Sequence, residues 1–419
     1  MVLADPVQSF NLPSRWARNV AGAVFLAMLL AGAVSAAWSV ATGRIEATAW
    51  ARQQIMQGEA ARELADELAK APFPSALADA ERAVSWLIAG SLGPRVREGC
   101  GQWLFLVDEL AVHPEGALNA RRRLEAVARV RDRLRRQGIE LVVATVPDKS
   151  RVQSEQLCGI YRPASSADRL GDWEKGLAQH GVRHASLLLP LAALERQGRE
   201  EPFLRTDTHW TEAGAETAAQ AVAQAVGKSG VELTPRQRYA MRQGEVEDRM
   251  GDLVRLAGIA WLPPALLPLP DRVAAMRFSV MPAAAGGAAS AAAAKAEAGR
   301  NGAAMDEAAD DLFGDANLPS VALIGTSYSG TSSFSSYLEA ALGTPVPSFA
   351  QDGGDFWLAA KTYLTGRDFR ETPPRLVVWE IPERVLQMPI VAGEAAWMQG
   401  LETPGGQAAP GVDATRQKM

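Results

Sequence analysis

An apolar, uncharged stretch near the N-terminus, residues 19–41, constrains this 419-residue chain more than any other feature. About 20 consecutive apolar residues are enough to cross a bilayer as a helix. Arg15 and Arg18 come just before the stretch, and basic residues ahead of a first span keep the N-terminus in the cytoplasm. We therefore predict cytoplasmic residues 1–18, a transmembrane signal anchor at residues 19–41, and export of the rest of the chain.

One alternative stays open at this anchor. Residues 34–36, Val-Ser-Ala, resemble a signal-peptidase site, so the stretch could instead be a cleaved leader. Its uninterrupted length and the flanking Trp38 favour an anchor that is kept, because tryptophan is enriched at membrane–water interfaces. Export follows from either interpretation.

The composition of the chain narrows the function classes. Hydrophobic residues make up 47% and charged residues 22%, as in an ordinary globular protein. A net charge of −5 argues against a general nucleic-acid binder, which would carry a basic excess. The two cysteines, Cys100 and Cys158, would be unrelated buried thiols in a cytosolic protein, whereas in an exported domain they could form a disulfide.

After the anchor, residues 42–92 are rich in Ala, Glu and Leu and predict a helical stalk. Helices and short apolar strands then alternate along the chain. The segments IELVVATVP (139–147), SVALIG (320–325) and RLVVWEIP (375–382) are the apolar, β-branched runs that parallel sheets bury. This alternation predicts an α/β layered fold with a mostly parallel central sheet, and active sites in such sheets lie at the carboxyl ends of the strands.

Four further segments carry local expectations. We predict a strand over RHASLLLP (183–190) and one helix from Tyr328 to about Leu342. Residues 282–311 are almost all small or acidic, so they cannot bury enough apolar surface to form a core, and they predict a flexible surface insertion. Residues 391–419 predict a flexible C-terminal tail.

Asp207 and His209 stand two residues apart in DTHWTEAG (207–214), and His209 is one of only four histidines. In a turn or an extended segment, residues at this spacing can meet on one side. A carboxylate that binds the imidazole Nδ1 fixes its tautomer and prepares the ring to accept a proton. A metal site is the rival interpretation, but it needs a further ligand, and no other histidine has a matching spacing. We therefore predict neither a metal nor another cofactor.

Ser327 lies in the turn between the strand SVALIG and the helix that follows it. That context exposes a serine at the sheet edge and directs the first N–H groups of the helix toward it, where they can stabilise an oxyanion. The arrangement resembles a nucleophile elbow in its logic, although the G-x-S-x-G pattern is absent. In the alternative interpretation, Ser327 or Thr326 merely caps the helix. A base such as His209 favours the nucleophile, because a serine hydroxyl must first lose its proton.

Four segments, in this order, carry a resemblance to a known family. They are GQWLFLVDEL (101–110), DTHWTEAG (207–214), GTSYS (325–329) and VVWEIPER (377–384). With these motifs the chain resembles the alginate O-acetyltransferases of the AlgJ/AlgX type, whose catalytic domain is SGNH-hydrolase-like. The resemblance implies Ser327 as nucleophile, His209 as general base and Asp207 as its orienting partner, in an SGNH-like acetyltransferase domain over residues 93–390.

Four more residues are candidates for the site. The backbone N–H of Ser327 would be the first donor of an oxyanion hole. Gly353 or Gly354 in QDGGDFW would supply the second, because a glycine allows close backbone approach, although an ordinary turn explains these glycines equally well. Lys149 and Arg151 follow the strand IELVVATVP and could bind an anionic substrate or donor, or form a surface salt bridge.

The resemblance implies an enzyme anchored in the inner membrane by a single span, with its catalytic domain in the periplasm. Ser327 would take an acetyl group as a covalent ester and pass it to a hydroxyl of an exopolysaccharide, such as alginate, or to a second transferase. A multi-spanning membrane acyltransferase would be the partner that supplies the acetyl group. The chain ends soon after the WEIPER strand, so no C-terminal carbohydrate-binding module is expected.

Two other functions stay open. The same triad would serve a carbohydrate or small-ester acetylesterase that releases acetate. A non-catalytic scaffold of a polysaccharide-secretion complex could also retain the DTHW segment for structural reasons. Hydrolysis that a sugar acceptor suppresses would separate the transferase from the esterase. Polysaccharide acetylation that Ser327→Ala leaves unchanged would point to the scaffold.

Overall fold

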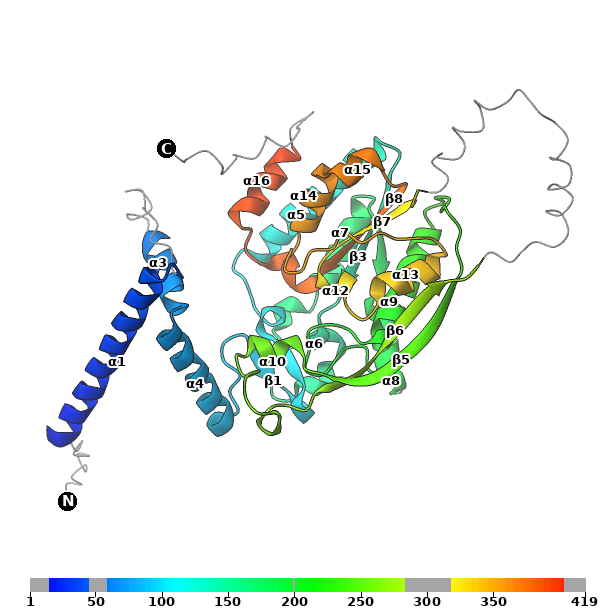
Figure 1. Cartoon of the computed structure of the whole chain (residues 1–419). Helices are drawn as coiled ribbons and strands as arrows, with labels where there is room; N and C mark the ends of the chain where they lie inside the picture. The colour runs from blue at the N-terminus through cyan, green and yellow to red at the C-terminus, as the bar shows by residue number, and fades with distance from the viewer. Residues whose placement is uncertain (1–14, 45–58, 199, 283–317, 403–419) are drawn as a thin grey trace, which may run out of the picture. The chain divides into compact units, whose positions relative to one another are not determined.

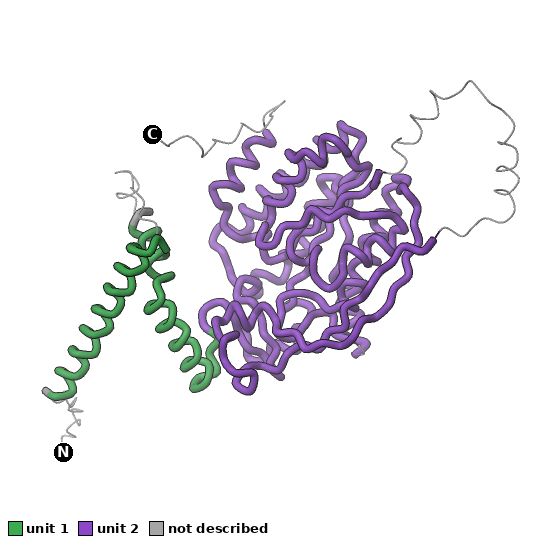
Figure 2. Tube along the Cα trace, in the orientation of Figure 1, with its two compact units in different colours: residues 1–92 green, residues 93–419 purple. Residues whose placement is uncertain are grey.

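The computed structural model describes residues 15–44, 59–198, 200–282 and 318–402 (Figure 1). The chain forms two compact units, Met1–Leu92 and Gly93–Met419 (Figure 2). The predicted insertion at 282–311 lies outside the described residues except for Pro282, and so do residues 403–419 of the predicted tail.

Three helices make up the described part of the first unit: α1 (Arg15–Ala41), α3 (Glu59–Ala69) and α4 (Pro72–Ala89). Among the described residues, α1 is the one helix that is long and apolar enough to cross a membrane, judged by length and composition. Its apolar window is not buried by the rest of the protein. This unburied apolar surface makes α1 a candidate membrane anchor.

A four-stranded parallel sheet organises the second unit. Its strands are β3 (Glu140–Val146), β4 (Arg183–Ser186), β7 (Val321–Ile324) and β8 (Leu376–Pro382), in the order β4-β3-β8-β7. The two central strands, β3 and β8, pair in parallel over their whole length. Every residue of β7 and β8 is buried, which is why these segments are apolar and β-branched. The predicted α/β fold with a parallel central sheet is confirmed.

Helices cover both faces of this sheet (Figure 1). Alternate strand residues point to opposite faces, so Val142 and Val378 pack into one core cluster and Leu141 and Val377 into the other. The first cluster includes residues of α9 (Glu212–Gly227) and α13 (Phe334–Leu342). The second includes residues of α5 (Gly116–Arg135), α7 (Arg169–Gln179) and α14 (Leu358–Thr365). The other α-helices described in the unit are α6 (Lys149–Val152), α8 (Leu188–Gln197), α10 (Asp252–Leu256), α12 (Ser327–Gly330), α15 (Arg367–Glu371) and α16 (Ala392–Gly400).

Two antiparallel strand pairs complete the described part of the unit. One joins β1 (Val96–Glu98) to β2 (Leu104–Leu106), and the other joins β5 (Tyr239–Arg249) to β6 (Asp271–Val280). A disulfide links Cys100, in the β1–β2 connection, to Cys158, with their Cα atoms 5.6 Å apart. Helix α10 lies in the connection between β5 and β6.

The prediction of a strand through residues 183–190 is wrong in its second half. Strand β4 ends at Ser186, where its pairing with β3 also stops. Leu187 already has a helical backbone, and α8 begins at the next residue. Leu187 and Leu191 are buried whereas Leu189 is exposed, and this spacing of four fits a helix with one buried side rather than a strand.

The single helix expected from Tyr328 to about Leu342 is divided in two. Helix α12 ends at Gly330 and α13 begins at Phe334. Ser332 and Ser333 lie between them in the left-handed region, with φ of 50° and 53°, a conformation that interrupts an α-helix. The Ser332 hydroxyl donates to the carbonyl of Trp210 at 2.7 Å, so the break ties this segment to the DTHW motif.

The predicted flexible tail at 391–419 is wrong for its first part, because α16 packs into the unit. Arg123 on α5 forms two hydrogen bonds with Glu394 on α16, at 2.7 and 2.8 Å, and both side chains are buried. The same guanidinium donates to the carbonyl groups of Leu386 and Met388. An ion pair between residues 271 positions apart therefore holds α16 against α5, and a local sequence pattern cannot predict such a pair.

Candidate active site

Ser327 is the first residue of α12, and Gly325 and Thr326 separate it from the carboxyl end of β7. Thr326 caps this short helix, since its hydroxyl accepts the Tyr328 N–H at 3.4 Å. Glu380, on the neighbouring strand β8, accepts hydrogen bonds from the Thr326 N–H, at 2.6 Å, and from its hydroxyl. A Cβ at Gly325 would lie 2.5 Å from the same carboxylate, so the turn requires glycine there. The cap is therefore Thr326, and the Ser327 hydroxyl stays available for chemistry.

His209 and Asp207 form a chain of hydrogen bonds with this serine. His209 Nε2 lies 2.7 Å from Ser327 Oγ, although the two residues are 118 positions apart. On the other side of the ring, Nδ1 lies 2.6 Å from Asp207 Oδ1, which also accepts the His209 backbone N–H at 3.0 Å. When Nδ1 donates its proton to Asp207, Nε2 is the nitrogen that can accept the Ser327 proton. The three side chains thus meet in the order serine, imidazole and carboxylate, which is the geometry that a Ser-His-Asp triad requires.

Asp207 is buried, and its surroundings decide its protonation state. Burial alone would raise the pKa of this carboxyl group. The hydrogen bond and charge of His209, with the backbone N–H groups of His209 and Asp252, outweigh burial and hold the pKa of Asp207 well below its usual range. Arg249 adds a positive charge 3.4 Å from Oδ2. Asp207 is therefore ionised at neutral pH and able to stabilise a protonated imidazole.

The turn that carries Asp207 is held by two buried side chains. Asp271, the first residue of β6, accepts the backbone N–H groups of Arg205, at 2.8 Å, and Thr206, at 2.9 Å. Lys149 Nζ donates to the carbonyl groups of Arg205 and Asp207, both at 2.9 Å. The backbone on both sides of Asp207 is thus fixed independently of its own side chain.

Aromatic residues join the two motifs. Tyr328 follows Ser327 in the chain, and its hydroxyl donates to the Thr208 carbonyl at 2.7 Å. Its ring lies 5.0 Å from the His209 ring and 5.1 Å from the Trp210 ring, centroid to centroid. Trp210 also packs against Phe334 at 4.7 Å. The residues that follow the histidine and the serine therefore hold Nε2 and Oγ at bonding distance by packing against one another.

Comparison with known proteins identifies the domain around this site. The family model described as "SGNH hydrolase-like domain, acetyltransferase AlgX" matches residues 96–383. The chain belongs to this family. It is 35% identical over 298 residues to the "Probable alginate O-acetylase AlgJ" of Pseudomonas putida, with 70% of this chain and 71% of that protein covered.

Two more relatives agree with this assignment. The "Probable alginate O-acetylase AlgJ" of Azotobacter vinelandii is 32% identical over 333 residues, with 78% of this chain and 79% of that protein covered. The solved structure titled "O-Acetyltransferase Domain of Pseudomonas putida AlgJ" matches with a TM-score of 0.59 and 30% identity, covering 74% of this chain and 98% of that chain. The resemblance drawn from the four motifs is confirmed.

In this member of the AlgX family, the side chains of Lys149 and Arg151 make structural contacts. Binding of an anionic substrate by Lys149 does not fit its burial, and Arg151 follows the other expectation, a salt bridge, although its partner Glu383 is buried rather than on the surface. Lys149 is fully buried, and its three donors are used by the carbonyl groups of Leu104, Arg205 and Asp207. Burial lowers its pKa to about 8, even though nearby carboxylates oppose this shift. The Arg151 guanidinium forms two hydrogen bonds with Glu383, at 2.9 and 2.6 Å, and bonds two carbonyl groups as well.

The two candidate oxyanion glycines differ in this domain. The Gly354 N–H donates to the Gln351 carbonyl at 3.0 Å, so it is not free to bind an oxyanion. Gly353 is exposed and has a left-handed backbone with φ of 66°, as a turn glycine does. The Gln351 N–H donates to the Gly325 carbonyl at 3.0 Å, which ties this loop to the nucleophile turn. Gly353 therefore stays a candidate and Gly354 does not.

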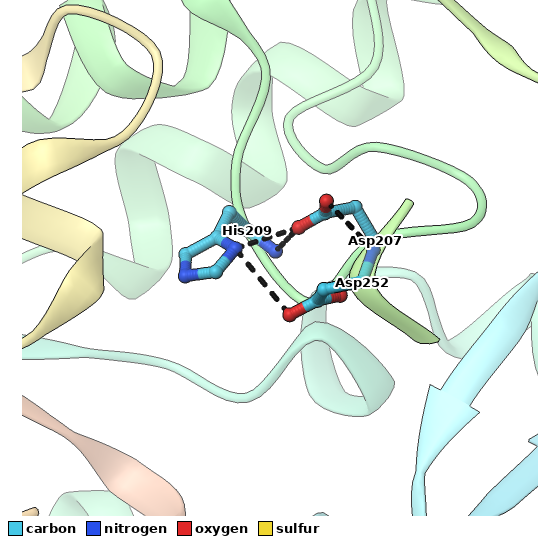
Figure 3. A group of neighbouring side chains, drawn as sticks. All are labelled: Asp207, His209 and Asp252. Carbon is cyan, nitrogen blue, oxygen red and sulfur yellow. Dashed lines mark hydrogen bonds and ion pairs between the residues drawn. The ribbon is translucent and has the colours of Figure 1, made fainter. Parts of the chain in front are cut away.

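Asp252 is the neighbour of the site that sequence reasoning missed. Together with Asp207 and His209 it forms a group whose ligand atoms lie within 4.8 Å of one another, a donor set that a cation could use (Figure 3). Each carboxylate oxygen in the group already accepts an N–H or O–H hydrogen bond, and His209 Nε2 faces Ser327. This hydrogen bonding suits proton transfer better than metal binding. The only local signal for Asp252 was a glycine before an acidic residue, which is too common to single it out.

Proposed function

We propose that this protein is a membrane-anchored O-acetyltransferase that carries acetyl groups on Ser327 for the O-acetylation of alginate or a similar exopolysaccharide. The single observation that carries the proposal is the 2.7 Å contact of His209 Nε2 with Ser327 Oγ, with Asp207 on the far side of the ring. The choice of an acetyl group and of alginate as acceptor rests on the names of the relatives, which are described as probable alginate O-acetylases.

The geometry supports a two-step transfer. Ser327 Oγ attacks the carbonyl carbon of an acetyl donor while His209 Nε2 takes the hydroxyl proton. The bond to the leaving group then breaks, His209 returns the proton to that group, and the acetyl ester stays on Ser327. In the second step an acceptor hydroxyl attacks the ester, His209 takes its proton, and Ser327 regains a proton as its bond to the acetyl carbon breaks. Asp207 stabilises the imidazolium in both steps.

The oxyanion of each tetrahedral intermediate needs N–H donors close to Ser327. The first is the Ser327 N–H, because the first N–H groups of a helix have no partner within it. The second is the Gly353 N–H, on the loop that Gln351 ties to Gly325. These donors would stabilise negative charge on the former carbonyl oxygen.

Anchoring and partners follow the same proposal. Helix α1 spans the inner membrane once, and the domain that begins after the stalk works in the periplasm. A disulfide between Cys100 and Cys158 suits that oxidising compartment. A multi-spanning membrane acyltransferase supplies the acetyl group, and the acceptor is the polymer or a second transferase.

The test measures hydrolysis of p-nitrophenyl acetate by the full chain in detergent, with mass spectrometry of the Ser327 peptide. Wild type should hydrolyse the ester and carry an acetyl group on Ser327, and both should be lost in Ser327→Ala and His209→Ala. His184→Ala is the matched control, because His184 lies on β4 and has no contact with Ser327 in the described structure. Its activity should equal that of wild type.

Alginate oligosaccharides added to the same assay separate transfer from hydrolysis. A transferase should form acetylated oligosaccharide at the expense of acetate, whereas an acetylesterase should release acetate at an unchanged rate. Wild type without activity, or activity that both variants retain, would reject the triad and favour a non-catalytic scaffold.

A further inference from the structure

A second carboxylate lies beside the imidazole of the triad. Asp252 Oδ2 is 3.7 Å from His209 Nδ1, on the side of the ring where Asp207 also binds (Figure 3). Asp252 is the first residue of α10 and comes from the β5–β6 connection, outside all four family motifs. The proposed transfer assigns it no step.

The approach of α10 to the triad depends on Gly251. A Cβ at this position would overlap the Thr206 carbonyl group and press on the Asp207 N–H. The Gly251 N–H donates to the Thr206 hydroxyl at 3.2 Å. Because only glycine permits this backbone contact, the chain is built to bring the next residue, Asp252, against the turn that carries the triad.

Asp252 then forms a closed set of hydrogen bonds with that turn. Its Oδ1 accepts the Thr208 N–H at 2.7 Å, and its Oδ2 accepts the Thr208 hydroxyl at 2.6 Å. In the opposite direction, the Asp252 N–H donates to Asp207 Oδ2 at 3.0 Å. Asp252 therefore holds both the residue between Asp207 and His209 and the carboxylate that orients the base.

We propose that Asp252 is a positioning residue for the acetyl transfer, which holds the Thr208 peptide in place and shares with Asp207 the charge of the imidazolium that forms on His209. The inference rests on the proposed roles of Ser327 and His209. Asp252 touches neither of the reacting atoms; it acts through His209 and Asp207.

The charges around the ring explain why a second carboxylate helps. His209 faces Asp207 and Asp252 at Nδ1, Ser327 at Nε2, and the ring of Tyr328 on one face. Arg249, which is 38% exposed, contacts Asp207 Oδ2 and offsets part of the charge of that carboxylate. Asp252, at 30% exposure, restores negative charge at a distance where attraction survives partial screening by water.

The experiment compares Asp252→Asn with Thr208→Ala in the p-nitrophenyl acetate assay across pH. In Asp252→Asn the amide oxygen can still accept the Thr208 N–H, and the NH2 group can donate to the Thr208 hydroxyl oxygen. The charge is therefore removed while both contacts with Thr208 can be kept, one of them with its direction reversed. We expect kcat/KM to fall roughly tenfold, the factor that about 1.4 kcal/mol represents, and the acidic limb of the pH–rate profile to move to lower pH. Thr208→Ala keeps the charge and removes one hydrogen bond, so its acidic limb should stay in place.

Glu247→Gln is the matched control, because it removes the same charge from the exposed strand β5 and has no described contact with the triad. Its rate and profile should equal those of wild type. An Asp252→Asn variant with an unchanged rate and profile would overturn the inference. Equal loss in Asp252→Asn and Thr208→Ala with unmoved acidic limbs would also overturn it, since the residue would then act by structure alone.

A second measurement does not depend on catalysis. The full chain has four histidines, so the ring signals of a histidine-labelled sample can be followed by NMR, and His209→Gln assigns the signals of His209. The pH midpoint of these signals should be lower in Asp252→Asn than in wild type and unchanged in Glu247→Gln. If wild type lacks esterase activity but this shift is present, the proposed function fails while the coupling of Asp252 to His209 stands. If the midpoint does not move, the coupling fails.

Discussion

Two groups of charged side chains lie near the carboxyl edge of the same sheet, and they are built for opposite purposes. One is the proposed triad with its neighbour: Asp207, His209, Asp252 and Ser327. The other, which we term the arginine cluster, consists of Asp148, Arg151, Arg162, Arg169 and Glu383. In the arginine cluster the carboxylates face guanidinium groups that never lose their charge. In the triad the partner of the carboxylates is an imidazole, which can gain and lose a proton near neutral pH.

The arginine cluster braces the two central strands. Asp148 and Glu383 follow β3 and β8, and the Asp148 N–H donates to Glu383 at 3.1 Å. Arg169 bridges both carboxylates. Burial and the charge of Glu383 raise the pKa of Asp148 well above its usual value. Burial would also raise the pKa of Glu383, but the hydrogen bonds and charges of Arg151 and Arg169 lower it.

A buried carboxylate is therefore not by itself a sign of a catalytic site. Asp207 is distinguished by what its partner contacts on the other side. The second ring nitrogen of His209 faces the Ser327 hydroxyl, whereas the guanidinium of Arg169 lies between two carboxylates, those of Asp148 and Glu383. A proton can move through the first arrangement and has nowhere to go in the second.

The largest effect is expected from a substitution that changes the chemistry of the triad but keeps the size of the side chain. Asp207→Asn should lower kcat for p-nitrophenyl acetate by about 10⁴-fold, because an amide in this position favours the wrong imidazole tautomer. Circular dichroism should show a folded protein. A loss smaller than about tenfold would contradict the role of Asp207 as the orienting carboxylate.

The next largest effect is expected on stability, from a substitution that disrupts the arginine cluster. Arg169→Ala should lower the free energy of unfolding by about 3–5 kcal/mol, because two buried carboxylates lose their shared cation. Urea denaturation measures this loss. Arg367→Ala removes an exposed pair with Glu371 and should cost less than about 1 kcal/mol. If the two variants lost equal stability, the arginine cluster would not be a brace.

A Lys149 variant tests whether the turn that carries Asp207 needs its buried support. Lys149→Met should cost roughly 3 kcal/mol of stability, because three buried carbonyl groups lose their donor. It should also lower ester hydrolysis per folded molecule, since the Asp207 carbonyl is one of the three. Thermal unfolding and the esterase assay on the same sample check both parts. Full activity in the folded variant would show that the turn does not need this support.

Glu383 of the arginine cluster should make the stability of the folded protein depend on pH. The pKa of Glu383 is held below its ordinary value of 4.5, so below pH 4.5 the unfolded chain binds a proton that the folded protein does not. Its contribution to the free energy of unfolding is therefore present above pH 4.5 and lost as the pH falls through the lowered pKa. Urea denaturation across this range should show a steeper loss for wild type than for Glu383→Gln. Parallel curves would contradict the assignment.

Removal of metal ions is expected to have no effect on activity. Dialysis of the full chain against EDTA should leave p-nitrophenyl acetate hydrolysis unchanged, because the carboxylate oxygens of Asp207 and Asp252 are engaged by N–H and O–H donors. Activity that is lost in EDTA and restored by Zn²⁺ would show that this group binds a cation instead.

Local pattern was enough to predict much of this protein. The parallel strands, the α/β class and the family followed from short apolar runs and from motifs of five to ten residues. Ser327, His209 and Asp207 could be named as candidates because each lies in a short segment whose residue types and spacing indicate a chemical role without knowledge of the tertiary contacts. The strand pattern also placed Lys149 and Arg151 correctly at the carboxyl edge of the sheet, but it could not predict that their side chains contact buried carbonyl groups and Glu383.

Tertiary structure alone decided the rest, because the deciding contacts join residues far apart in the chain. Asp252 reaches the triad 43 positions after His209, through a backbone contact that only Gly251 permits. Helix α16 is held by the pairing of Glu394 with Arg123 across the whole domain. Burial works in the same way: Lys149 and Asp148 have ordinary side chains in the sequence, and only the surrounding core determines which donors, acceptors and charges they meet.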